Sequence, residues 1–157
     1  MCTCINYQNN DFYFGRNLDL EYSFNEKVVI TPRNYLLKLK NKKEFKTKYA
    51  IMGMATVIDN YPLYAEGCNE NGLCIAGLYF PDNAYYNKEK VGKINITPFE
   101  IIPWLLGNYK TIDEIKAIIN KINIINANFK DNLPSAPLHW IVSDDKQCIV
   151  IEQTKKD

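Results

Sequence analysis

Alternating apolar and polar positions at the start of the chain predict a β-hairpin. The segment Cys2–Tyr7 alternates loosely, reaches the polar run Gln8–Asp11, and is followed by the apolar run Phe12–Phe14. Two short alternating segments around a turn-forming composition are typical of paired antiparallel strands. We therefore expect a hairpin that returns the Arg16–Asp19 segment to the neighbourhood of the first residues.

Further apolar runs extend this strand pattern along the chain. Val28–Thr31 is stopped by Pro32, and Ala50–Ile58 predicts a buried strand with a bulge at Gly53. The lysine-rich stretch Lys38–Lys48 is interpreted as a solvated loop or strand edge without function. The other expected strands are Leu63–Cys68, Leu73–Phe80, Leu138–Val142 and Gln147–Glu152.

Two capping boxes predict helices after these strands. Thr97 is followed by proline and then by glutamate three residues on, and Thr111 also has glutamate three residues on. The first helix should end near residues 107–108, with Pro103 tolerated close to its start. The second helix carries an apolar stripe at helical spacing, interpreted as core, and residues 123–136 are expected to form a polar loop. The stripe consists of Ile112, Ile115, Ile118, Ile119 and Ile122.

The order of elements and the composition bound the class of protein. Strands, two helices and then strands indicate an α+β fold with antiparallel sheets. The 157 residues are 46% hydrophobic and show no repeat or linker, so we expect one domain over 1–157 with its own core. The net charge of +1 favours neither a nucleic-acid nor an anionic membrane partner.

Cysteine usage and the termini predict a cytoplasmic protein. The 5 cysteines are irregularly spaced, which favours reduced thiols over a disulfide framework. Three of them, Cys68, Cys74 and Cys148, fall in apolar strands and are interpreted as small buried hydrophobes. No secretory signal and no membrane-spanning run of about 20 apolar residues is visible.

The second residue carries the candidate chemistry. A small side chain behind an initiator methionine normally permits removal of Met1, after which Cys2 would carry a thiol and a free α-amino group. The thiolate is a nucleophile with a free pKa of about 8.5. The α-amino group titrates at about 7.7–8.0 and can act as a base near neutral pH. One residue would thus supply both nucleophile and base.

Arg16 and Asp19 are the candidate partners of Cys2, because the expected hairpin brings them back beside it. A fixed guanidinium stabilises a thiolate, and a carboxylate holds an ammonium group in place. Taken alone, a cysteine at this position is usually just a residue near a frayed terminus. A zinc site at Cys2 and Cys4 is not favoured, since His139 is the only histidine and itself lies in an apolar strand as an expected core residue.

Several segments from one end of the chain to the other share the pattern of a known family. They are Met1–Thr3, Phe14–Tyr22, Ile30–Asn34, Lys48–Met54, Asn60–Pro62, Glu66–Leu73, Ala76–Pro81 and Leu138–Asp144. In this order they resemble the choloylglycine hydrolase family of N-terminal-nucleophile amidases, which contains bile salt hydrolases and penicillin V acylases. The resemblance implies an αββα sandwich, about half of which is present here as antiparallel sheets and one helical layer from residues 97–122.

The resemblance also implies a mechanism. The amide bond of a conjugated bile salt or a penicillin V type acyl amide would be hydrolysed through a thioester on Cys2. Arg16 would flank the thiol, Asp19 would orient the α-amino group, and Tyr79 would contribute to the oxyanion hole. Neither a cofactor nor a metal is expected, and the partner is a small-molecule amide rather than a nucleic acid or a membrane.

Two features of the resemblance bear on the substrate. Tyrosine at Tyr79 is typical of penicillin V acylases, where bile salt hydrolases have asparagine, whereas the rest of the sequence is nearer the bile-salt branch. The tyrosine favours penicillin V or another acyl amide, including acyl-homoserine lactones, as the substrate. An apolar acyl or steroid pocket is implied, although each lining residue could equally be core. The lining residues are Leu18, Ile58, Ala65, Phe129 and Leu133.

The resemblance covers only the N-terminal half of the family's length. After the segment similar to Gln147–Thr154, the family supplies a catalytic asparagine and a further arginine that complete the site. The alternative hypothesis is therefore a truncated, catalytically inactive fragment that acts at most as a binding or assembly module. A full-length relative is expected to be a homo-oligomer.

Overall fold

The computed structural model describes residues 2–41 and 43–155, and a seven-stranded antiparallel sheet forms its centre. Its strands run in the order β13-β12-β9-β8-β6-β3, and β7 pairs with β6 as well. The apolar runs predicted as strands after the hairpin all lie in this sheet, but the predicted strand Leu63–Cys68 is divided between two strands, β7 and β8. The strands are β3 (Lys27–Thr31), β6 (Ile51–Ile58), β7 (Tyr61–Tyr64), β8 (Glu66–Asn69), β9 (Cys74–Tyr79), β12 (Leu138–Ser143) and β13 (Cys148–Ile151).

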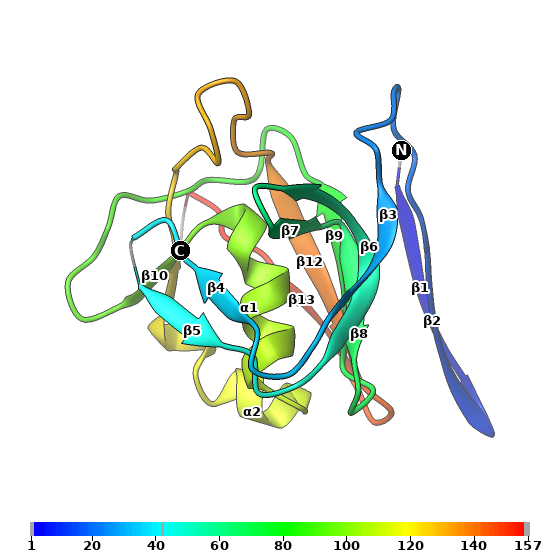
Figure 1. The fold of residues 1–157 in the computed structure, drawn as a ribbon. Helices are drawn as coiled ribbons and strands as arrows, with labels where there is room; N and C mark the ends of the chain where they lie inside the picture. The colour runs from blue at the N-terminus through cyan, green and yellow to red at the C-terminus, as the bar shows by residue number, and fades with distance from the viewer. Residues whose placement is uncertain (1, 42, 156–157) are drawn as a thin grey trace.

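Helices cover one face of this sheet (Figure 1). The first begins as the 3₁₀ turn Pro98–Glu100 and continues as α1 (Ile101–Asn108), after which come α2 (Ile112–Lys116) and the 3₁₀ turn Ile119–Lys121. The side chains between helices and sheet are fully buried and apolar, as the hydrophobic effect requires of such an interface. They include Ile51, Ile75, Ile101, Leu105, Ile115, Trp140 and Val142. None of the helices in the described part of the chain has the length and apolarity that crossing a bilayer would require.

The second helix is shorter than predicted. It stops at Lys116, and β11 (Ile122–Ile124) pairs in parallel with β10 (Ile94–Ile96), so the predicted loop over 123–136 begins inside a strand. Isoleucine is β-branched and suits a pleated strand better than a helix, and this pairing buries Ile124. The expectation of purely antiparallel sheets is wrong for this small pair.

The lysine-rich stretch is also more ordered than predicted. It forms the two-stranded sheet of β4 (Leu36–Lys38) and β5 (Glu44–Lys46), which lies over α1 in Figure 1. Leu37 is buried, and the backbone N–H of Lys48 donates to the carbonyl of Gly107 at 2.7 Å. The described lysines of this stretch are exposed to solvent, and the small sheet packs on the outer side of the helix.

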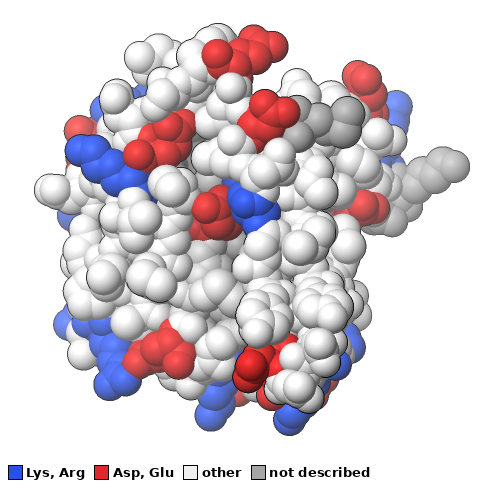
Figure 2. Space-filling view, turned by 90° about the vertical axis from the view of Figure 1, so that its right-hand side faces the viewer, with Lys and Arg blue, Asp and Glu red and all other residues white. Residues whose placement is uncertain are grey.

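A two-stranded ribbon of β1 (Thr3–Asn9) and β2 (Asp11–Asn17) lies on the opposite face of the main sheet (Figure 1). Asn10 makes the turn with a positive φ of 60°. The molecule thus has a ribbon, a sheet and a helical layer in succession, which confirms the predicted partial αββα arrangement. The outer side of the ribbon exposes Ile5, Tyr7 and Tyr13, and Figure 2, which views the molecule from this side, shows broad areas without charged side chains.

A β-bulge interrupts the middle of the sheet opposite Gly53. Ala55 of β6 pairs with Tyr64, and Met52 pairs with Cys68, so two residues of β6 face three residues of the neighbouring chain segment, 65–67. A Cβ atom on Gly53 would lie 2.1 Å from the backbone oxygen of Glu66, which is too close for any other residue type. The bulge predicted at Gly53 is therefore real, but its extra residue belongs to the partner segment.

Two of the five cysteines are joined, contrary to the expectation of reduced thiols. Cys68 and Cys74 lie directly opposite each other on β8 and β9 and form a disulfide, with their Cα atoms 4.0 Å apart. Among the described residues, Cys2, Cys4 and Cys148 remain free thiols. Cys148 is exposed rather than buried, so its interpretation as a core residue is wrong.

Candidate active site

The register of the ribbon decides which of its side chains face the main sheet. Cys4 lies directly opposite Arg16, and Asn6 lies opposite Phe14. Directly opposed residues of an antiparallel pair share a face, so all four point to the same side. The amide of Asn6 donates to the hydroxyl of Ser143 on β12, which identifies this side as the one against the sheet.

Arg16 is the most firmly held side chain of the ribbon. Its Nη1 donates to Oε2 of Glu66 at 2.6 Å, and its Nη2 donates to the backbone carbonyl of Gly77 at 2.9 Å. The Arg16 side chain is only 3% exposed, whereas that of Glu66 is 22% exposed. Nε of Arg16 has no hydrogen-bond partner within the described residues, so one donor of the buried guanidinium is left over.

Cys2 and Asp19 meet where the ribbon begins and ends. The Sγ atom of Cys2 lies 4.0 Å from the backbone oxygen of Asp19, and the thiol is half-buried. Asn17 closes this end of the ribbon, since its side-chain oxygen accepts the backbone N–H of Thr3 at 2.5 Å. Met1 lies outside the described residues, so the predicted removal of Met1 stays a prediction.

The two thiols near the start of the ribbon differ in their surroundings. Burial raises the pKa of the Cys4 thiol to about 11, although the charge of Arg16 across the ribbon lowers it. Cys4 is therefore a protonated thiol at neutral pH and a poor nucleophile. Of the two, only Cys2 has the position to act near Asp19.

Tyr79 closes β9 and is 63% exposed, paired with Leu138 in the register of the sheet. The next residue, Phe80, stacks on the ring of His139 with 4.5 Å between ring centroids. Nδ1 of His139 lies 3.1 Å from Oε1 of Glu152. His139 is therefore engaged on its face and its edge, but it is partly exposed and not the core residue that was expected.

The five predicted pocket residues are all half-buried, and the structure brings only some of them together. Phe129 packs its ring against Tyr61 and Phe99, at centroid separations of 5.5 and 5.2 Å. Ile58 pairs with Tyr61, and the backbone N–H of Phe129 donates to the carbonyl of Leu133. Three of the five, Ile58, Phe129 and Leu133, thus share one neighbourhood.

Ala65 and Leu18 lie elsewhere. The carbonyl of Ala65 accepts the N–H of Gly77 at 2.9 Å, which places Ala65 beside the carbonyl that Arg16 contacts. Leu18 follows directly after β2, next to Asp19. A hollow of about 260 Å³ near the end of β6 includes only one of the predicted residues. Its lining consists of Phe24, Asn25, Lys27, Thr56, Val57 and Ile58.

Sequence reasoning missed Glu66 and Gly77, which hold Arg16. Glu66 is the one carboxylate in the predicted strand Leu63–Cys68. A charged residue in an apolar strand is rarely buried unless it is paired, and that signal could have identified Glu66 as the partner of a cation.

Comparison with known proteins adds a family to this geometry. Residues 2–157 match the linear amide C–N hydrolases of the choloylglycine hydrolase family. A bile salt hydrolase/transferase of Lactiplantibacillus plantarum is 50% identical over 156 residues, which cover 99% of this chain and 48% of the relative. The chain spans about half the length of the curated relatives that it matches.

Solved structures agree with the fold. A variant of conjugated bile acid hydrolase from Clostridium perfringens superposes with a TM-score of 0.93 at 41% identity, covering 100% of this chain and 49% of the other. Penicillin V acylase from Agrobacterium tumefaciens gives a TM-score of 0.77 at 17% identity, covering 99% and 47%, a likeness of fold alone.

Proposed function

The chain belongs to the choloylglycine hydrolase family of linear amide C–N hydrolases, and from that premise we propose that the protein hydrolyses an acyl amide with Cys2 as nucleophile. The observation that carries the proposal is the position of Cys2 beside Asp19, on the ribbon whose inner side presents Arg16. The raised pKa of Cys4 supports the choice of Cys2 over its neighbour.

The proposed reaction has two halves. The Cys2 thiolate attacks the amide carbonyl carbon, and the resulting oxyanion is held by donors that include Tyr79. The carbon–nitrogen bond breaks as the α-ammonium group of Cys2, held by Asp19, gives its proton to the leaving amine. Water then attacks the thioester, which releases the carboxylic acid and returns the thiol.

Arg16 contributes to this reaction through its charge. A guanidinium buried on the inner side of the ribbon favours the ionised form of a nearby thiol. Its buried Nε has no hydrogen-bond partner within the described residues. The role of Arg16 is thus to stabilise the thiolate, while its other two contacts fix its place.

We propose a conjugated bile salt as the first substrate to test. The Lactiplantibacillus plantarum relative supports this choice through its name and its identity to this chain. The partly exposed apolar side chains of Ile58, Phe129 and Leu133, with Ala65 and Leu18 nearer the ribbon, would contact the apolar acyl part. Tyr79 supports penicillin V type amides as the second candidate.

The test is the exchange of one atom at Cys2. Cys2→Ser should reduce hydrolysis of glycocholate by about 10³-fold or more, because a hydroxyl of much higher pKa replaces the thiol. Cys148→Ser is the matched control, since it changes an exposed free thiol of β13 that has no part in the proposed reaction, and it should leave the rate unchanged. Intact mass of the active protein should show the loss of Met1. Retained Met1 in active protein, or an active Cys2→Ser variant, would refute the proposal.

A further inference from the structure

Glu66 takes no direct part in the proposed reaction, but its carboxylate pairs with Arg16 of the ribbon. We propose that Glu66 is a positioning residue, which holds the guanidinium of Arg16 and thereby fixes the ribbon against the main sheet. The inference rests on the proposed function for the roles of Cys2 as nucleophile and Tyr79 as oxyanion donor. The ion pair between Arg16 and Glu66 is independent of that function.

Arg16 and Glu66 form a bridge between two layers. Their nitrogen and oxygen lie 2.6 Å apart, and the guanidinium is almost completely removed from solvent. Among the ion pairs of the described residues, this is the one that joins β1–β2 to the main sheet. A buried charge is costly unless a hydrogen-bonded counter-ion is paired with it, so Glu66 is the residue that holds the guanidinium of Arg16 in place.

The bulge in the sheet carries Glu66. The three residues 65–67 face only two residues of β6, so Glu66 lies in the bulge. Because Gly53 has no side chain, the backbone of Glu66 can approach it more closely than a Cβ atom would allow. Bulges commonly re-aim a side chain next to a site. Here the re-aimed side chain is the carboxylate that meets the ribbon.

The same guanidinium also reaches the strand that carries Tyr79. Nη2 of Arg16 donates to the carbonyl of Gly77, two residues before Tyr79 on β9. Glu66 is paired with Ala76 across β8 and β9, so the two acceptors of Arg16 lie on neighbouring strands. Displacement of Arg16 would therefore loosen the ribbon that carries the nucleophile from the strand that carries the oxyanion donor.

Electrostatics give a second consequence of the pair. Near the ribbon thiols the positive charge of Arg16 and the negative charge of Glu66 oppose each other, as the surroundings of Cys4 show. Removal of the carboxylate charge leaves the guanidinium uncompensated. If the glutamine of the Glu66→Gln variant still accepts from Arg16 and keeps the guanidinium in place, the thiol of Cys4 should ionise at a lower pH.

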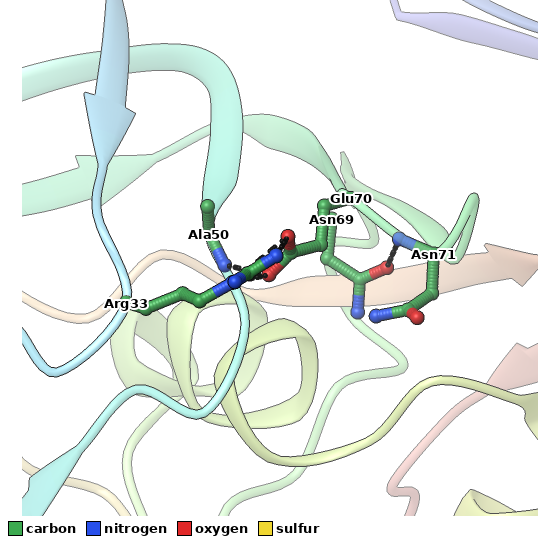
Figure 3. Close-up of polar contacts among 5 residues, drawn as sticks. All are labelled: Arg33, Ala50, Asn69, Glu70 and Asn71. Atoms are coloured by element: carbon green, nitrogen blue, oxygen red, sulfur yellow. Dashed lines mark hydrogen bonds and ion pairs between the residues drawn. The ribbon is translucent and has the colours of Figure 1, made fainter.

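The kinetic experiment measures kcat and KM for amide hydrolysis in protein that shows this activity. It compares the Glu66→Gln and Glu66→Ala variants with the Glu70→Gln variant. Glu70 is the matched control, since it lies in the turn after β8 and is also bound to an arginine, Arg33, away from the ribbon (Figure 3). Glu66→Ala should lower kcat by about 10²-fold with little change in KM, as expected for a misplaced catalytic group. Glu66→Gln, which keeps an acceptor, should lose less, and Glu70→Gln should behave as the wild type. A kcat of Glu66→Ala equal to the wild type would overturn the inference.

The titration experiment needs no turnover. The rate of iodoacetamide alkylation at Cys4 is followed against pH by peptide mass spectrometry in the wild type, Glu66→Gln and Glu70→Gln. The midpoint should fall in Glu66→Gln alone, and an unchanged midpoint would overturn the inference. If the wild type hydrolyses no amide, the proposed function fails, and this titration still decides whether Glu66 controls the charge at the ribbon.

Discussion

Replacement of Asn69 should destabilise the protein more than any other single polar truncation in the turn between β8 and β9. The Asn69 side chain is 5% exposed and makes four hydrogen bonds. Its Oδ1 accepts the backbone N–H groups of Asn71 and Leu73 at 3.0 and 3.2 Å (Figure 3 shows the first). Its Nδ2 donates to the carbonyls of Leu106 and Tyr109 at 3.0 and 2.7 Å.

The magnitude follows from what these partners lose. A helix leaves its last carbonyls without intrahelical partners, and Asn69 takes up that of Leu106 at the end of α1. Each bond contributes about 1 kcal/mol net, and a buried carbonyl left alone costs about 1–3 kcal/mol. Water can replace the partners at Asn71 and Tyr109, which are less buried. We therefore expect Asn69→Ala to lower the free energy of unfolding by about 3 kcal/mol, which corresponds to about 6–12 °C in Tm.

Urea unfolding followed by circular dichroism measures this change, with the m-value serving as a check that the unfolded state is unaltered. Asn71→Ala is the matched control, because Asn71 is exposed and only its backbone N–H, which alanine retains, contacts Asn69. The control should change the free energy of unfolding by no more than about 0.5 kcal/mol. A loss below about 1 kcal/mol in Asn69→Ala would refute the view that this side chain ties the turn to the helix.

Two further predictions concern pH and substrate. Hydrogen bonds from Arg33 and the backbone of Ala50 lower the pKa of Glu70 to about 2, so the stability that Glu70 contributes is present above its unfolded pKa of about 4.3 and is lost as pH falls toward 2. The difference in unfolding free energy between the wild type and Glu70→Gln should therefore shrink from pH 7 to pH 2, and a constant difference would contradict this. Tyr79→Asn should shift the ratio of kcat/KM values away from penicillin V and toward glycocholate, and an unchanged ratio would remove Tyr79 as a determinant.

The parts of the fold that the sequence predicted correctly are those with local causes. The first helix begins at its capping box, where the N–H of Thr97 donates to Oε2 of Glu100 at 2.8 Å. Pro103 is tolerated because it lies in the first turn of α1, where its missing N–H would have had no partner. The β1–β2 hairpin likewise follows from a polar turn between two short apolar segments.

The second helix failed for a reason that is not local. The stripe from Ile112 to Ile122 fits helical spacing, but its last part pairs with Ile94–Ile96, which lies some distance away along the chain. Nothing in the sequence of the stripe itself indicates that it pairs with this distant strand. The disulfide was missed for a different reason, since Cys68 and Cys74 are close in sequence but become opposed only once the turn between β8 and β9 sets the register.

The candidate site divides in the same way. Cys2, Arg16 and Asp19 lie close in sequence, and one hairpin brings them into a single region, so their shared location could be predicted. Glu66 could not be assigned a face, because a single extra residue in the bulge shifts the alternation of every side chain beyond it. Whether Glu66 meets the ribbon or the helical layer is therefore decided by Gly53 on another strand, whose missing side chain permits the bulge. The ribbon that carries the candidate site can be recognised from its own residues, but the carboxylate that pairs with its arginine is identified only in the folded structure.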